Sequence, residues 1–269
     1  MRDQGRSDPQ RWLIGQPDQS TDAVMTVAAD DRGDLRVEVD KMRALAARHG
    51  VTVTFEQRGD TLPGPRAGHE HFGFKDGISQ PGVIGFDEAD ADGRFRKDHP
   101  GDEMIEAGEF VLGHRRLGNE PWPHPEWMGD GSFQVFRRLR QDVPGWWAQV
   151  TKQTQSLASD DPMKEDLLAA KLVGRWRSGT PLARAPERDN RSAQDRLRDN
   201  DFDYADDREG QKTPRFAHIR KMYPRDRSAF GDDRRRLLRR GIPFGRPFDP
   251  AAGRGRVSTP TAASSSTRS

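Results

Sequence analysis

An aspartate in an unusual setting is the first residue of this sequence that could do chemistry. Asp76 lies in the stretch HEHFGFKDGISQP, residues 69–81, between apolar residues and a glycine, where no helical period is present. A carboxylate in such a place is either a turn former, because Asp-Gly is a favourable turn pair, or a working acid that moves a proton. The stretch by itself leaves both interpretations open.

A histidine and an arginine further along the chain extend the chemistry that Asp76 could serve. His218 stands among apolar residues in FAHIRKMYPRD, where an imidazole is either a packed helix residue or a metal ligand. Arg239 lies in RRRLLRRGIPFG, residues 234–245, beside two leucines. A run of arginines is usually a solvated face, but an arginine next to an apolar anchor can point inward, where it stays charged and needs an anionic partner.

Two more histidines flank Glu70 and suggest a metal site. His69 and His71 do not have the four-residue spacing of a zinc helix, although in a strand they would share one face. A weak metal site is therefore the alternative to a scaffold role for this pair. The histidines of the expected loops are interpreted as surface or structural residues: His99, His114 and His124.

Composition narrows the class of function. The chain has 269 residues and no cysteine, which excludes disulfides, thiolate metal sites and a cysteine nucleophile. Its 45 basic residues nearly balance 43 acidic ones, so nucleic acid is not the expected partner. A hydrophobic content of 32% and a charged content of 33% are those of a chain that is ordered only in part.

The termini and hydropathy predict the compartment. Residues 1–19 are polar and charged, with no apolar run of the kind found in secretory signals. No stretch approaches the roughly 20 apolar residues of a membrane span. We therefore expect a soluble cytoplasmic protein with no membrane partner.

The periodicity of the sequence predicts three helices and four strands around these residues. Helices are expected over 30–50, 145–155 and 161–173, the last with a capping Asp161 and a proline in its first turn. Strands are expected over 23–28, 51–57, 109–114 and 132–141. The residues between 61 and 100, 119 and 130, and 184 and 210 are expected to be loops. The early strand, helix and strand suit a ferredoxin-like α+β unit or, as the alternative, the start of a doubly wound sheet.

Six stretches in a fixed order give a closer interpretation. Together they resemble the dye-decolorizing haem peroxidases over residues 22–245, and the first contains the Gly-x-x-Asp-Gly motif of that family. The matching stretches are GFKDGISQP, GSFQVFRRLRQDV, AKLVGRWRSGTPL, NDFDYADD, FAHIRKMYPRD and LLRRGIPFG.

The resemblance implies a cofactor, haem b, and a role for each candidate residue. His218 would be the proximal ligand of the haem iron and Asp76 the distal group that moves a proton between the oxygens of hydrogen peroxide. Arg239, chosen over Arg240 by its distance from the Gly-Ile-Pro-Phe-Gly that follows, would bind at the haem and stabilise developing negative charge. The resulting ferryl haem would oxidise dyes or phenolic compounds in one-electron steps.

Bulky electron donors in the family are thought to react at surface aromatic residues. The candidates here are Trp122, Trp127, Trp176 and Tyr204. The family also forms homo-oligomers, so a homo-oligomer is an expected assembly.

The family fold implies two ferredoxin-like domains with antiparallel sheets, of the dimeric α+β barrel type. We expect a disordered or partial N-terminus over 1–20, a first domain over 21–130, a second over 131–245, and a disordered tail over 246–269. The pattern is lost after Gly245, and the start of the chain matches the inside of the first domain, so the second domain is expected to be incomplete and the chain truncated. A non-catalytic haem-binding remnant or an inactive fragment is the rival to the enzyme. An arginine-rich binding module for acidic partners is a third reading, which the near-balance of charge disfavours.

Overall fold

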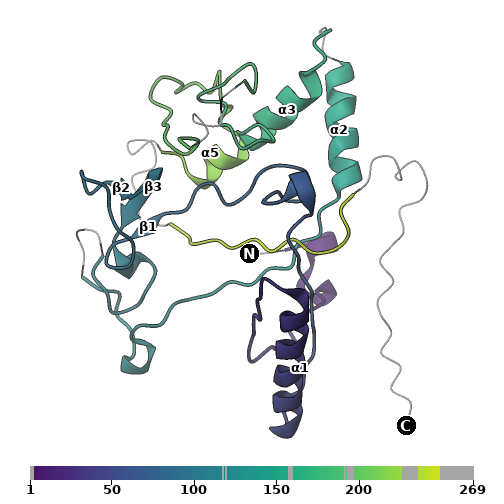
Figure 1. The fold of residues 1–269 in the computed structure, drawn as a ribbon, viewed down its shortest axis with the longest axis vertical. Helices are drawn as coiled ribbons and strands as arrows, with labels where there is room; N and C mark the ends of the chain where they lie inside the picture. Colours follow the sequence, from purple (N-terminus) through teal and green to yellow (C-terminus); the bar gives the residue numbers. More distant parts are fainter. Residues whose placement is uncertain are drawn as a thin grey trace. The chain divides into compact units, whose positions relative to one another are not determined.

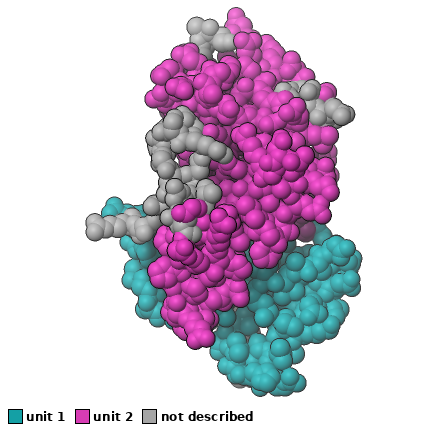
Figure 2. Space-filling view, turned by 90° about the vertical axis from the view of Figure 1, so that its left-hand side faces the viewer, with its two compact units in different colours: residues 1–59 teal, residues 60–269 magenta. Residues whose placement is uncertain are grey.

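The chain divides into two compact units, residues 1–59 and 60–269, which Figure 2 colours separately. The structure is a computed structural model that describes residues 3–116, 118, 120–156, 160–190, 192, 197–225 and 236–248. Most of the tail predicted over 246–269 lies outside these residues. Within them, every helix is too short or too polar to reach across a bilayer.

The first unit is built on one long helix, α1 (Arg32–Arg48) (Figure 1). The Asp31 carboxylate accepts hydrogen bonds from the backbone N–H groups of Gly33 and Asp34, which begins the helix as an N-cap. The helix predicted over 30–50 is confirmed. Two short 3-10 turns precede it: η1 (Gly5–Ser7) and η2 (Pro9–Arg11).

The two strands predicted on either side of α1 are wrong. Residues 23–28 and 51–57 are irregular, and in the described chain neither pairs with another strand. Their β-branched side chains are exposed, Val51 and Val53 among them. Strand-forming residues make a strand only when a neighbouring backbone completes the ladder.

In the second unit a small mixed sheet joins three strands (Figure 1). They are β1 (Gly82–Val83), β2 (Phe95–Arg96) and β3 (His99–Ile105), in the order β1-β3-β2. Strand β1 runs parallel to β3 with Gly82 opposite Met104, whereas β2 is antiparallel to β3. Most of this sheet falls where a loop was predicted, because strands of two residues carry no alternating pattern.

The main helices of this unit are α2 (Val143–Gln155) and α3 (Lys164–Val173), which lie against each other. Both predicted helices are confirmed. Helix α2 begins two residues before its predicted start and α3 begins three residues after its predicted start. Asp161 accepts a hydrogen bond from the Met163 N–H ahead of α3. The helix ends at Gly174, whose φ of 98° lies in the left-handed region that glycine adopts without strain.

The strands predicted over 109–114 and 132–141 are also wrong. The first region holds the 3-10 turn η4 (Ala107–Glu109) followed by turns. The second is irregular, and its Phe133 and Val135 side chains are 78% and 81% exposed, so no neighbouring element covers the apolar side chains that suggested a strand. Two further 3-10 turns lie in the predicted loops: η3 (Gly64–Arg66) and η5 (Glu126–Met128). The unit is therefore α+β, as predicted, with one small sheet.

The core between α2 and α3 receives part of the stretch that contains Asp76. Phe74 is only 5% exposed and packs with Val150 of α2 and Ala169 of α3. Phe72 lies against the Trp146 ring, with centroids 5.1 Å apart. Burying these two rings fixes the loop to the helices from one side.

Truncating Phe74 to alanine is expected to lower the free energy of unfolding by about 3–5 kcal/mol, because the substitution removes a buried ring and leaves a cavity. Denaturant titration followed by circular dichroism measures the change. Phe133→Ala, which truncates an exposed ring, is the control and should change the stability by less than about 0.5 kcal/mol. Equal losses in the two variants would contradict this account of the core.

Candidate active site

The Asp76 loop is held by backbone hydrogen bonds on both sides of the aspartate. The Asp76 N–H donates to the Gly68 carbonyl at 2.9 Å, and the Lys75 N–H donates to the Arg177 carbonyl at 3.0 Å. The Gly77 N–H donates to Asp76 Oδ1 at 2.8 Å, at a bend and not a hydrogen-bonded turn, so the carboxylate contacts the backbone of the next residue only. The side chain is exposed, and its second oxygen makes no turn contact.

Glu70 organises this loop, a role that the sequence did not reveal. Its carboxylate accepts hydrogen bonds from the N–H groups of Phe72 and Phe74 at 2.9 and 2.8 Å, and from the Gln141 side chain at 2.5 Å. These bonds bend residues 70–74 into a turn that directs both phenylalanines into the core. The sequence pointed instead to the two histidines that flank Glu70, as a possible metal site.

His69 and His71 do not form a metal site in this structure. His69 forms an isolated antiparallel β-bridge with Lys75 and His71 lies in a turn, so the two do not share one strand, and the His69 ring contacts the Ala67 carbonyl at 3.1 Å. In the part of the chain that is described, no group of three or more metal-ligating side chains comes together. The scaffold role of the pair stays a prediction.

His218 opens the short helix α5 (His218–Met222). Ala217 before it is fully buried, and Ile219 packs so closely against Gly174 that a Cβ there would lie 2.4 Å from the Ile219 side chain. The His218 ring itself is exposed and has no hydrogen bond to the described residues. The helix is therefore fixed by its neighbours while the imidazole stays open to a ligand.

Arg220 ties α5 to a buried carboxylate. Its guanidinium lies 3.3 Å from Asp207 and donates to the Thr213 carbonyl at 2.7 Å and the Asp207 carbonyl at 2.8 Å. Burial by itself raises the pKa of Asp207, but hydrogen bonds from the backbone of Thr213, Lys212 and Gln211, together with the charge of Arg220, outweigh burial and lower it. Asp207 is thus ionised at neutral pH and holds the helix.

Asp207→Asn is expected to destabilise the chain by about 2 kcal/mol at pH 7, because it removes the charge that Arg220 needs. A depressed native pKa contributes stability above the unfolded value, near 3.9, and that contribution is lost as the pH falls through the native pKa. The gap between wild type and variant should therefore narrow below about pH 4. Thermal unfolding from pH 3 to pH 7 measures this gap, and a gap that stayed constant would contradict the assignment.

The segment that carries Arg239, residues 236–248, is attached to the Asp76 loop. The Gln80 side chain donates to the Arg239 carbonyl at 3.0 Å, and the Asp60 N–H donates to the Pro243 carbonyl at 2.9 Å. The backbone also approaches Asp76 closely, since a Cβ at Gly241 would lie 2.9 Å from Asp76 Oδ2. The 236–248 segment and the Asp76 loop, far apart in sequence, are thus in direct contact.

The three predicted residues act on one another electrostatically. The pKa of His218 is lowered, first by partial burial and then by the positive charge of Arg239, while the negative charge of Asp76 opposes the shift. The charges of Arg239 and Asp76, from two other segments, therefore both act on the His218 ring. A lowered pKa keeps the imidazole neutral at pH 7, which is the form that binds metal ions.

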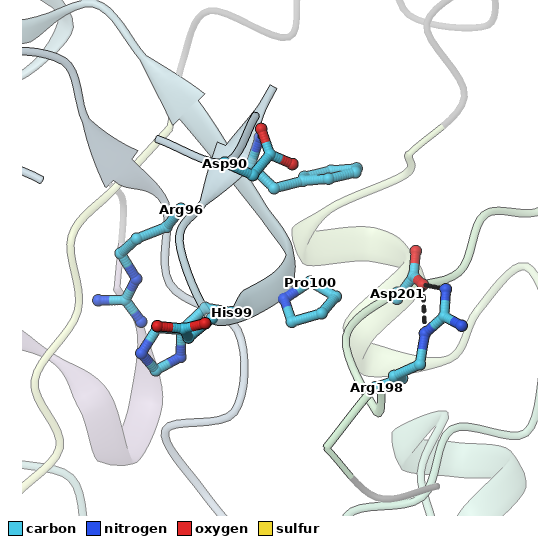
Figure 3. A pocket seen from close by; sticks show the side chains of 8 residues that line it. Asp90, Arg96, His99, Pro100, Arg198 and Asp201 are labelled. Carbon is cyan, nitrogen blue, oxygen red and sulfur yellow. Dashed lines mark hydrogen bonds and ion pairs between the residues drawn. The ribbon is translucent and has the colours of Figure 1, made fainter. Parts of the chain in front are cut away.

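A small cavity of about 140 Å³ adjoins these residues. Arg239 lines it, with Ser79 and Pro81 from the Asp76 loop and Met222 and Tyr223 from the end of α5. A larger cavity of about 280 Å³ has Arg198 and Asp201 on one side and Arg96 and His99 on the other (Figure 3). None of the three predicted site residues lines the larger cavity, whereas Arg239 lines the smaller one.

The side chains of α5 and of the 236–248 segment have the chemistry of a haem site. A neutral imidazole without a hydrogen-bond partner in the described chain suits an iron ligand. Met222, Leu237 and Ile242 leave apolar side chains exposed, and a flat apolar macrocycle would cover such surface. The Arg239 guanidinium supplies a positive charge at the cavity wall.

The four candidate aromatic residues separate by burial. Trp122 and Trp127 are exposed, whereas Trp176 and Tyr204 are 2% and 1% exposed. The expectation that all four lie at the surface is therefore wrong for Trp176 and Tyr204. Trp176 packs in a buried cluster with Ala170, Leu182 and Ala185, and the Arg220 guanidinium lies 4.3 Å from the centroid of the Tyr204 ring.

No protein-family model matches the chain, but individual proteins do. A dye-decolorizing peroxidase of Mycetinis scorodonius is 34% identical over 244 residues, which cover 87% of this chain and 45% of that protein. A multifunctional dye peroxidase of Amycolatopsis sp. is 34% identical over 247 residues, which cover 87% of this chain and 49% of that protein. The chain spans about half the length of the curated relatives it matches.

Solved structures agree with these relatives. A dye-decolorizing peroxidase in complex with 2,6-dimethoxyphenol has a TM-score of 0.70 at 32% identity, over 83% of this chain and 50% of that chain. A fungal DyP-type peroxidase from Auricularia auricula-judae has a TM-score of 0.71 at 29% identity, over 86% of this chain and 52% of that chain. Over most of its length, the chain is a relative of the dye-decolorizing peroxidases.

Proposed function

We propose that the chain is a haem-dependent peroxidase that reduces hydrogen peroxide and oxidises dyes or phenolic compounds in one-electron steps. The observation that supports this most directly is that the charges of Arg239 and Asp76 both act on His218, and that Arg239 lines a cavity, in a chain similar to such enzymes. When bound, haem b would supply the iron that reacts with peroxide and stores the oxidising equivalents.

His218 would hold the iron through its neutral imidazole. The depressed pKa of His218 removes competition by a proton at neutral pH. The Asp207 and Arg220 ion pair would fix the direction of the ring by fixing α5. An exposed imidazole on a helix that is held by its neighbours would suit an iron ligand.

Asp76 would accept a proton from one oxygen of hydrogen peroxide and return it to the other, so that water can leave. One carboxylate oxygen, Oδ1, is held by the Gly77 N–H, which keeps the side chain in one orientation. The other oxygen faces the segment that carries Arg239 and is available for the transfer. The hydrogen bond from the next residue would thus orient the acid.

Arg239 would stabilise the negative charge that grows on the departing oxygen. Its backbone is held by Gln80, a residue of the Asp76 loop, so the two groups keep a fixed spacing. The charge of Arg239 on the His218 ring supports its placement near the metal.

The electron donor would be a phenolic compound or a dye. A solved relative is described in complex with 2,6-dimethoxyphenol, which is a donor of this class. Trp122 and Trp127 are exposed aromatic side chains at which a donor too large for the cavity could react. A homo-oligomer is part of the proposal as the family's usual assembly.

The proposed architecture has two ferredoxin-like domains, over 21–130 and 131–245, the second of them incomplete. The TM-scores against solved peroxidases support this arrangement in general terms.

A haem-binding chain without turnover is the second candidate. It is favoured by the exposure of Asp76, His218 and Arg239, because a working peroxidase site excludes bulk water.

Reconstitution distinguishes the two candidates. The full chain is titrated with haemin, and its absorption spectrum is recorded before and after hydrogen peroxide is added. A Soret band that shifts with peroxide, together with oxidation of 2,6-dimethoxyphenol, supports the peroxidase. A Soret band without dye or phenol oxidation supports the second candidate, and the absence of haem uptake rejects both.

A further inference from the structure

One carboxylate on strand β3 is bonded to two segments of the candidate site. Tyr223, the residue directly after α5, donates its hydroxyl hydrogen to Glu103 Oε2 at 2.7 Å. Arg236 lies 3.5 Å from the same oxygen. Tyr223 follows the helix that begins with His218, and Arg236 begins the segment that carries Arg239.

The two partners of Glu103 also contact each other. The Arg236 guanidinium lies over the Tyr223 ring, 3.6 Å from its centroid. The side chains of Glu103 and Arg236 are each only 11% exposed. A carboxylate this buried is stable only when its charge is matched, so Glu103 and Arg236 depend on each other.

The same position of β3 also anchors the Asp76 loop. Pro81, which lines the cavity, leads directly into β1, and Gly82 of β1 lies opposite Met104 in the parallel register. Met104 is the residue after Glu103. Two adjacent residues of β3, Glu103 and Met104, therefore contact all three segments that carry the candidate residues. These segments are the Asp76 loop, the end of α5 and residues 236–248.

We propose that Glu103 is a positioning residue, which sets the distance between α5 and the Arg239 segment and so the width of the cavity between them. This inference rests on the proposed function. The distance between α5 and the Arg239 segment matters only if haem binds between them, with His218 on one side and Arg239 on the other. Glu103 would act through Tyr223 and Arg236 and would not touch the substrate.

The absence of cysteine from the sequence makes the distance measurable. Lys221→Cys and Arg240→Cys, both at exposed positions, place one spin label on α5 and one beside Arg239. Pulsed electron resonance then gives the label-to-label distance distribution of the full chain without haem. We expect a single narrow distribution when Glu103 is present and loss of that distribution in Glu103→Ala.

Four further variants separate positioning from general stability. Glu103→Gln keeps an oxygen that accepts from Tyr223 and should restore most of the narrow distribution. Tyr223→Phe removes only the hydroxyl and should broaden it. Glu88→Gln, which loses an exposed carboxylate paired with Lys97, should leave it unchanged. Phe74→Ala should lower the unfolding temperature without broadening it.

A Glu103→Ala distribution as narrow as that of the parent would overturn the inference. If Glu103→Ala does not fold, as judged by circular dichroism, Tyr223→Phe decides in its place, and an unchanged distribution in that variant overturns the inference equally. Failure of the proposed function is a separate result, since it is seen as the absence of haem uptake by the unlabelled parent chain.

Discussion

Replacement of His218 by alanine is expected to abolish haem retention while the chain stays folded. The His218 imidazole is exposed, and its side chain makes no hydrogen bond to the described residues that folding would lose. Desalting after reconstitution should leave a Soret band in the parent and none in the variant. The circular dichroism spectra of the two proteins should coincide.

Two variants sharpen this experiment. His49→Ala removes an exposed histidine of the first unit and should retain haem as the parent does. His218→Gly opens space at the same position, and free imidazole added to it should restore the Soret band by replacing the missing ligand. Retention of haem by His218→Ala would assign the ligand elsewhere.

Replacement of Arg239 by leucine is expected to lower the rate of reaction with hydrogen peroxide by about 10²- to 10³-fold, the usual effect of removing one preorganised group that stabilises developing charge. The backbone contacts of residue 239 with Gln80 do not need the guanidinium, so haem content and fold should be kept. Stopped-flow absorption at the Soret band gives the rate constant directly.

Arg240→Leu is the matched control for this prediction. It removes the same charge from the neighbouring residue, which does not line the cavity. A peroxide rate close to that of the parent is expected. A large loss in Arg240→Leu with little loss in Arg239→Leu would exchange the two assignments.

The sequence predicted the helices well because their signals are local. Asp31 caps α1 through its own neighbours, and α2 and α3 carry apolar residues at helical spacing on the faces that they bury. The strands failed for the complementary reason. A strand is completed by a partner from elsewhere in the chain, and residues 51–57 and 132–141 have none in the described regions.

The sequence predicted the three candidate site residues from their types and their neighbours. It did not predict the residues that hold their segments in place. Asp76, His218 and Arg239 each lie in a recognisable stretch. Glu70 and Glu103 do not, because a carboxylate that accepts hydrogen bonds from distant segments looks in sequence like any surface acid. Such roles are visible only once the chain is folded.

The irregular segment 132–141 has a consequence for handling the protein. In the described chain its backbone joins no sheet, while Phe133 and Val135 point into solvent, so copies of the chain can pair edge to edge through it. Three arginines in the same stretch give neighbouring copies like charges that oppose this pairing. Added salt screens that repulsion over a distance of about 10 Å at 0.1 M, so the chain should stay monodisperse longest in buffers of low ionic strength.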